Sequence, residues 1–200
     1  FNLNGSSSGV ISIKPQAAAG TYNFNLPTTA GTTGQRLVSG GGSAAAMTWD
    51  DPQITWIISD VKASGVTGGA FANAAFRTRT LNTIVSTAVN SSVTIASNQI
   101  TMTAGTYIIR ASAPAYGVAN HATRLQNITD ATTAGFGTSE LTPTVTLSVT
   151  RSVINTVVTI ASTKVFEIQH RCQTTNNTNG FGIASGFQSE VYTTVIITQK

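Results

Sequence analysis

From Trp56 to the last residue, short stretches of alternating apolar and polar residues recur, separated by Gly, Asn, Ser or Pro. Alternation places apolar side chains on one face of a β-strand, and short strands at regular spacing indicate a sandwich or barrel. No stretch repeats apolar residues at helical spacing beyond one or two turns. The sequence predicts an all-β fold, with strands at 57–61, 77–85, 93–102, 106–113, 122–129, 144–149, 157–161, 164–172, 181–184 and 190–199.

The composition favours strands over disorder or a nucleic-acid-binding surface. Of the 200 residues, 9% are charged and 40% hydrophobic, whereas disorder needs the opposite balance. Abundant Thr and Val also disfavour helices. The 11 basic residues outnumber the 7 acidic ones but are scattered, with Arg77 and Arg79 as the densest group. Because nucleic-acid binding shows as a clustered patch, we expect no nucleic-acid partner; a weak positive charge would help approach to an acidic cell envelope.

Residues 1–55 differ from the remainder of the chain. Runs of Ala, Gly and Thr separate their short apolar pieces, which lie at 10–13, 22–26, 35–39 and 47–49. Pieces this few and short bury too little surface to fold without outside help, and three copies intertwined around one axis would supply it. We therefore expect a stem over 1–55 and a compact head over 56–200. Since the chain starts at Phe1 and not at Met, we expect a longer chain to precede it.

Cys172 is the single cysteine, which excludes an intrachain disulfide and a Cys-based zinc site. In the predicted strand 164–172, Phe166, Ile168, His170 and Cys172 share one face. We expect His170 and Cys172 to be buried there, without a metal. No apolar run approaches the roughly 18 residues of a membrane span, so we expect neither membrane insertion nor a signal peptide.

Catalytic patterns are sparse. Glycan hydrolases need paired carboxylates, one with a pKa raised by burial. The predicted head carries five acids: Asp60, Asp130, Glu140, Glu167 and Glu190. Asp60 and Asp130 lie at strand ends, where solvated surface carboxylates are usual. His121 and His170 are far apart in sequence, and no Gly-x-Ser-x-Gly elbow occurs. We expect no enzyme, cofactor or metal; an axial ion bound by one histidine from each of three copies stays open.

Two parts of the chain carry motifs of a known kind. The first contains a strand, Leu-Pro, Gly-Gln-x-Leu-x-Ser-x-Gly and Trp at residues 9–13, 22–27, 34–43 and 47–49, and this series resembles the shaft segment of phage tail fibres and tail spikes. The second resembles the carboxy-terminal domains of tail fibres, whose layout is similar to the TNF/C1q-like jelly roll. It is carried by residues 76–83, 104–115, 124–129, 164–170 and 190–192.

This resemblance implies a homotrimer with an intertwined β-rich stem and a TNF/C1q-like jelly-roll sandwich head. It implies a receptor-binding fibre tip on the virion, joined to upstream fibre or baseplate proteins. Such a tip attaches to a host cell-surface receptor, for which we expect a polysaccharide that is bound and not cleaved. A structural trimerisation or assembly domain and an envelope-glycan hydrolase stay open as alternatives. The acidic calcium ligands of some C1q-like heads have no clear counterpart here.

Glycan sites draw polar and aromatic groups from exposed loops, and we expect such loops at 116–124 and 176–187. The candidate receptor-binding residues are Tyr116, Asn120, His121 and Arg124 in the first loop, and Asn176, Asn177, Asn179 and Phe181 in the second. Ordinary solvated turn residues are the alternative. By resemblance, and because interface cores favour aromatics, we place Tyr107, Phe166 and Tyr192 along or near the threefold axis. A core position inside each protomer stays open for them.

Overall fold

A computed structural model describes residues 2–4, 10–12, 24–41, 45–50, 52–86, 92–145 and 148–200. Every helix or strand assigned in these ranges is a strand, so the predicted all-β class is confirmed. The same ranges hold no helix of the length and apolarity that a membrane crossing requires. The chain forms two compact units, Phe1–Pro52 and Gln53–Lys200, whereas the sequence placed the division between residues 55 and 56.

Four short strands belong to the first unit: β1 (Asn2–Asn4), β2 (Val10–Ser12), β3 (Arg36–Val38) and β4 (Thr48–Asp50). The second unit contains β5 (Thr55–Lys62), β6 (Arg77–Thr78), β7 (Thr83–Ser86), β8 (Val93–Ala96), β9 (Gln99–Met102), β10 (Gly105–Tyr116), β11 (Ala119–Asn127), β12 (Thr132–Thr142), β13 (Val149–Ile160), β14 (Lys164–Cys172) and β15 (Glu190–Gln199).

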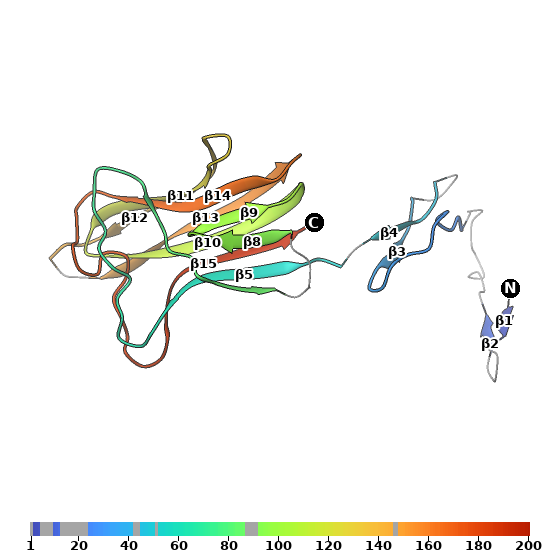
Figure 1. The fold of residues 1–200 in the computed structure, drawn as a ribbon, viewed down its shortest axis with the longest axis horizontal. Helices are drawn as coiled ribbons and strands as arrows, with labels where there is room; N and C mark the ends of the chain where they lie inside the picture. The colour runs from blue at the N-terminus through green and yellow to red at the C-terminus, as the bar shows by residue number, and fades with distance from the viewer. Residues whose placement is uncertain are drawn as a thin grey trace, which may run out of the picture. The chain divides into compact units, whose positions relative to one another are not determined.

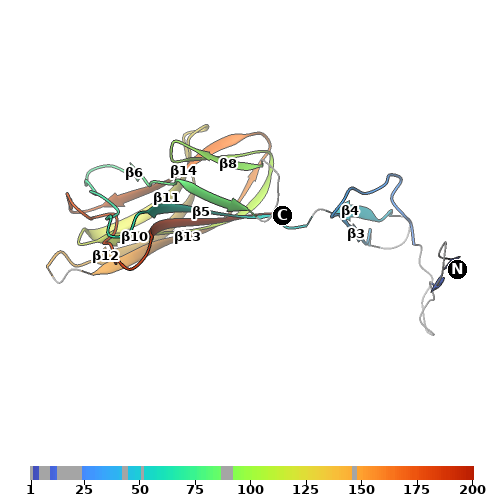
Figure 2. The same ribbon diagram turned by 60° about the horizontal axis from the view of Figure 1, so that its bottom comes forward.

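The main strands of the second unit pair in a nested, antiparallel order. β5 pairs with β15, β9 with β14, β10 with β13, and β11 with β12. The first main strand of the unit therefore pairs with the last, and the two innermost strands, β11 and β12, pair with each other. This nested order is the pattern of a jelly roll. Two layers result, β7-β5-β15-β10-β13 and β12-β11-β14-β9-β8 (Figure 1, Figure 2). They join where Gly137 of β12 pairs with Ile154 of β13, so the unit is a jelly-roll-like sandwich.

The core lies between the two layers, because each strand turns alternate side chains inward. Trp56 and Ile58 of β5 and Phe166 and Ile168 of β14 belong to one cluster, and none of the four is more than 1% exposed. Other strands add Val93, Ile100, Met102, Tyr107, Ile109, Ala111, Leu125, Ile154, Val158, Ile160, Val195 and Ile197. Burial stabilises by about 1.5–3 kcal/mol per large apolar side chain, and this cluster therefore holds the layers together.

The first unit contrasts with this core. Among the side chains that the structure describes there, none is buried. β3 and β4 form a hairpin closed by an ion pair of 2.6 Å between Arg36 and Asp50. Trp49 covers Gly31, where an added Cβ would lie 2.6 Å from the indole. An exposed ion pair contributes at most about 1 kcal/mol. These contacts therefore do not replace the buried apolar surface that so small a segment needs for stability.

Several predicted strands agree with the structure. The predicted strands 164–172 and 190–199 coincide with β14 and β15, and 57–61 lies within β5. Those at 106–113 and 122–129 correspond to β10 and β11, although β10 runs on to Tyr116 and β11 already begins at Ala119. Strong alternation of apolar and polar residues therefore located these strands.

Other predicted elements are corrected. Segment 77–85 is divided into β6 and β7, and 93–102 is a hairpin whose turn residues Ser97 and Asn98 have φ of 50° and 65°. Residues 181–184 and 24–26 form no strand. Within the predicted strand 144–149, residues 144–145 form a turn and Val149 begins β13. β13 also covers the predicted strand 157–161 except for Ala161, and β12 was not predicted. The predicted stem residues 13, 22 and 23 and head residues 146 and 147 lie outside the described residues.

Candidate functional site

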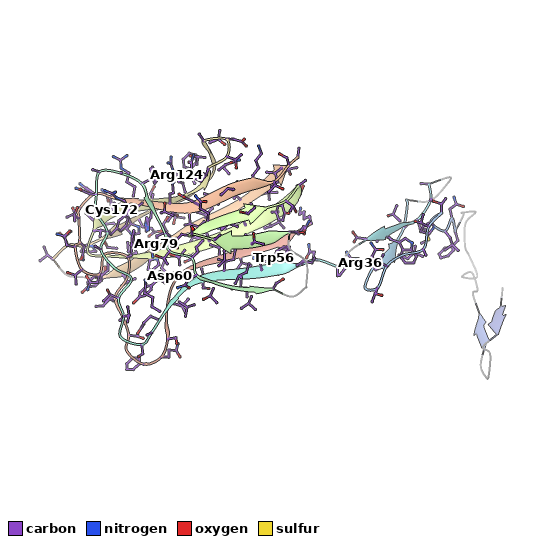
Figure 3. All side chains as sticks on the ribbon, viewed as in Figure 1. Arg36, Trp56, Asp60, Arg79, Arg124 and Cys172 are labelled. Carbon is purple, nitrogen blue, oxygen red and sulfur yellow. The ribbon has the colours of Figure 1, made fainter. Side chains whose placement is uncertain are left out.

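Many connecting loops of the second unit gather at one end. Thr55 of β5 pairs with Thr198 of β15 at the end where the chain enters, whereas Lys62 and Glu190 pair at the opposite, far end. The far end carries the loops that include 63–76, 117–118, 143–145 and 173–189 (Figure 1). Trp56 and Cys172 mark the two ends in Figure 3. Loops on a rigid scaffold are where binding groups usually lie.

A groove of about 830 Å³ lies at this far end, on the outer face of the β12-β11-β14 layer. Two rows of outward side chains cross the strands beneath it: Gln173, Asn120 and Leu141 in one row, and Arg171, Ala122 and Ser139 in the other. Because the Ala122 side chain ends at Cβ, the second row is low at its centre. The loop before β6 contributes a wall of Asn73, Ala74 and Phe76.

Arg124 braces the Phe76 wall. Its guanidinium carbon lies 3.9 Å from the centre of the Phe76 ring, a cation–π contact of about 0.5–1 kcal/mol at a partly exposed site. Gln169 Oε1 accepts hydrogen bonds from Arg124 Nε and Nη2, at 2.9 and 2.7 Å, and so fixes the guanidinium. Phe71 and Asn176 exchange two backbone hydrogen bonds that anchor the start of the loop. The wall is therefore preformed.

Amide groups lie along the groove next to that wall. Asn120 Nδ2 donates to Gln173 Oε1 at 2.9 Å, and Asn73 Nδ2 donates to the Gln173 carbonyl at 3.2 Å. Within the described ranges, Asn120 Oδ1 and Gln173 Nε2 have no hydrogen-bond partner. The oriented pair thus offers a ligand one acceptor and one donor.

His121 and His170 meet beneath the groove, although 49 residues separate them in sequence. His121 Nδ1 and His170 Nε2 share a hydrogen bond of 2.9 Å, and His121 Nε2 shares another, of 2.7 Å, with the Thr150 hydroxyl. The rings are 3% and 0% exposed. Burial lowers the pKa of His121 to about 4, against the opposing charge of Glu140. Burial also holds the pKa of His170 well below its usual range, so both rings are neutral at pH 7.

Arg79 is buried deeper in the head, at 1% exposed. Its Nε donates to the Thr193 hydroxyl at 2.8 Å and its Nη2 to the Phe181 carbonyl at 3.0 Å. The guanidinium carbon also lies 4.1 Å from the centre of the Phe181 ring. Burial lowers the Arg79 pKa to about 9, and the charge of Asp60 opposes that shift. Arg79 therefore stays charged at neutral pH and ties β15 to the loop containing Phe181.

Asp60 is buried, which corrects the expectation of a solvated carboxylate at a strand end. β5 continues to Lys62 and turns Asp60 inward, leaving it 1% exposed. Its Oδ1 accepts no hydrogen bond in the described part of the chain, and Lys62 Nζ lies 3.7 Å away. Burial raises the Asp60 pKa, against the opposing charges of Lys62 and Arg79. The buried Asp60 carboxyl is therefore more readily protonated than a solvated one.

Glu190 is buried too, at 6% exposed. The backbone N–H groups of Ser185, Gly186 and Gly65 donate to its carboxylate at 2.8–3.1 Å. These hydrogen bonds lower the Glu190 pKa to about 2. As a carboxylate, Glu190 therefore binds the far-end loops that contain Gly65 and Ser185. It is no proton donor at neutral pH.

The first predicted binding loop is wrong as a loop, because β10 ends at Tyr116 and β11 begins at Ala119. Asn120 and His121 line the groove, with the His121 ring turned inward. Arg124 lies outside the lining and braces its wall. Tyr116 does not line the groove and is half-buried, and its carbonyl accepts a hydrogen bond from Asn176 Nδ2 at 3.1 Å.

The second predicted loop lies outside the groove. Asn176 Oδ1 accepts hydrogen bonds from the backbone N–H groups of Thr178 and Asn179, so its side chain shapes the turn. Phe181 packs on Phe71 with ring centres 4.3 Å apart. Asn177 is exposed and Asn179 half-buried. Apart from Asn120 and His121, the groove uses residues that the sequence analysis did not select; an aromatic in a polar loop, Phe76, was the available signal.

The structure places Tyr107, Phe166 and Tyr192 inside the protomer, with 0%, 0% and 3% of each exposed. The Tyr107 hydroxyl donates to the Thr103 carbonyl at 3.1 Å, and the Tyr192 hydroxyl donates to the Val66 carbonyl at 2.7 Å. The core position, which the sequence left open, is therefore the one observed. Tyr107 and Phe166 belong to the core cluster between the layers, and Tyr192 reaches the loop that holds Val66; the placement of the three residues near a threefold axis stays a prediction.

His170 and Cys172 are buried as predicted, at 0% and 5% exposed. Burial raises the Cys172 pKa to about 11, which disfavours the reactive thiolate. No three His, Cys, Asp or Glu side chains cluster as a metal site among the residues described.

No protein-family model matches the chain, and no curated protein matches it.

Proposed function

We propose that this chain is the receptor-binding tip of a phage tail fibre, a homotrimer that attaches the virion to a host cell-surface polysaccharide without cleaving it. The observation that carries the proposal is the groove at the far end of the head, with its preformed aromatic wall and unpaired amide groups. The sequence resemblance to tail fibres supports it. So does the nested strand order, which agrees with a TNF/C1q-like jelly roll.

Two surfaces support association of three copies. The first unit lacks buried side chains in its described part, and neighbouring copies would supply the missing contacts. On the head, the outer face of the β7-β5-β15-β10-β13 layer aligns Val85, Ile57 and Ile196 across three strands, at 61%, 45% and 38% exposed. Exposed apolar side chains in such a row are typical of an interaction surface.

This assembly leaves the groove accessible. The apolar row and the groove lie on the outer faces of different layers, so contact through the first face does not cover the second. Three grooves on one fibre tip then act together. Weak single sites, millimolar to micromolar, gain about 10²–10⁴ in avidity where the geometry lets several engage at once.

The experiment mixes the purified full chain with isolated envelope polysaccharides from a panel of bacteria. It measures both the protein retained and the reducing sugar released, while light scattering gives the mass of the assembly. We expect retention without release, and a mass about three times 20.7 kDa. Release of reducing sugar would favour the hydrolase, and a trimer retained by none of the polysaccharides would favour the structural assembly domain.

A further inference from the structure

Arg171 is the unpaired cation of the groove. It is exposed and lies next to Ala122 in the cross-strand row. Within the described residues, the ion pairs involve Arg36, Lys62 and Lys164, and Arg171 neither forms one nor donates a hydrogen bond. Its five N–H donors are therefore available to a ligand, in the planar fork that fits a carboxylate.

Neither of the two acids near this groove forms an ion pair with Arg171. Glu167 accepts hydrogen bonds from Thr78, Gln99 and Gln169 at 2.8–3.0 Å. Glu140 pairs with His121 in the strand register, on the side of β12 away from Ala122, and its Oε1 accepts a hydrogen bond from the Thr138 hydroxyl. Glu140 lines the groove as well and forms no ion pair among the described residues, so Arg171 on β14 is the cation of the groove and Glu140 on β12 its anion, with β11 between them.

Phe76 supplies an apolar surface beside that charge. Arg124 lies over the ring, and other ring atoms are free to line the groove. The C–H face of a pyranose packs on such a ring, while its hydroxyls need donors and acceptors like Gln173 Nε2 and Asn120 Oδ1. A sugar ring that carries a carboxylate matches the wall, the amides and the arginine together.

We propose that the groove binds an acidic saccharide, with the sugar ring against Phe76 and its carboxylate paired with Arg171. This inference rests on the proposed attachment function and narrows its receptor to carboxylate-bearing glycans. Asn120 and Gln173 hold the ring hydroxyls and set its orientation. Charge-assisted pairing with the carboxylate gives the preference over a neutral sugar of the same shape.

The test compares methyl glucuronide with methyl glucoside, which differ in the carboxylate, on the full-length assembly. Saturation-transfer NMR measures binding of each probe, and titration gives the affinities. We expect the glucuronide to bind at least about tenfold more tightly, the equivalent of one charge-assisted hydrogen bond. Arg171→Met should remove that preference. Lys200→Met deletes the same charge at the opposite end of the head and should retain it.

Equal affinity for the two probes overturns the inference, as does a preference that survives in Arg171→Met or an absence of glucuronide binding. Retention on envelope polysaccharides is measured separately on the parent chain. If the parent is retained there but shows no preference for glucuronide, the acidic-saccharide inference fails and the attachment function stands. If glucuronide binds through Arg171 but no envelope polysaccharide retains the protein, the groove is confirmed and the attachment function fails.

Discussion

Replacing Arg79 with Met should destabilise the head more than any exposed substitution. The guanidinium is 1% exposed and donates to the Thr193 hydroxyl and the Phe181 carbonyl. Methionine fills a similar volume but leaves both acceptors without their donor. An unsatisfied buried polar group costs about 1–3 kcal/mol, and Asp60 also loses an opposing charge. Removing the desolvation of the guanidinium offsets part of this, so we expect a net loss of about 3 kcal/mol.

Urea unfolding followed by tryptophan fluorescence measures this loss. Trp56 is 1% exposed within the head, so its emission shifts when the head core opens, and a Trp49→Phe background removes the other tryptophan. Protein concentration is held constant because association adds to apparent stability. Arg171→Met is the matched control, since Arg171 is an exposed arginine on β14 whose side chain forms no ion pair or hydrogen bond among the described residues. If Arg79→Met unfolds within about 0.5 kcal/mol of this control, where surface substitutions usually lie, the hydrogen bonds of Arg79 do not hold the loop.

Three further predictions concern the same fold. Lowering the pH from 6.5 to 4.5 should destabilise the head by up to about 2 kcal/mol for His121, because a depressed histidine pKa makes the unfolded chain take up the proton first. His121→Gln should reduce the fall of the urea midpoint over this range without abolishing it, because the pKa of His170 is lowered too. Gly182→Ala should cost more than Gly186→Ala in the same urea assay, since both have positive φ but an added Cβ at Gly182 alone meets Tyr192, at 2.3 Å. Cys172 should react with a thiol reagent only on unfolding, given its burial and raised pKa; rapid labelling of the native protein would contradict the packing.

Alternating sequence located the strands that line the core. Phe166 and Ile168 in β14, and Val195 and Ile197 in β15, are buried at every second position, and the predicted bounds of both strands equal the observed ones. β12 lacks that signal because its inward face must be small. At Gly137 an added Cβ would lie 2.1 Å from Thr123 Oγ1 and 2.7 Å from Ser152 Oγ. The close junction of the two layers therefore selects glycine, and glycine hides the strand from a search for apolar alternation.

The hairpin of β8 and β9 was hidden for a different reason. Its turn places Ser97 and Asn98 at positive φ, where glycine is the usual signal. Without a glycine, 93–102 has the pattern of one continuous strand.

The groove depends on which residues of neighbouring strands pair, and this register cannot be read from the alternation of residues along the sequence. Asn120 and Gln173 belong to β11 and a loop 53 residues apart, and meet because β11 pairs with β14. The same pairing joins His121 to His170, which looked unrelated along the chain. Asn120 was selected as a polar residue in an expected loop, whereas Arg171 lies within a predicted strand and was not selected. Arg171 acquires a candidate role when Ala122 and Phe76 are placed beside it.

A bulky side chain placed in the groove tests whether the head attaches to polysaccharide through it. Ala122→Trp places an indole on the groove floor between Arg171 and Ser139, and Thr132→Trp places the same group at an exposed position near the other end of β12. Both variants should keep the parent's mass by light scattering. Retention on the envelope polysaccharide that holds the parent should then be lost in Ala122→Trp and kept in Thr132→Trp. Equal retention of the two variants would contradict attachment through this groove.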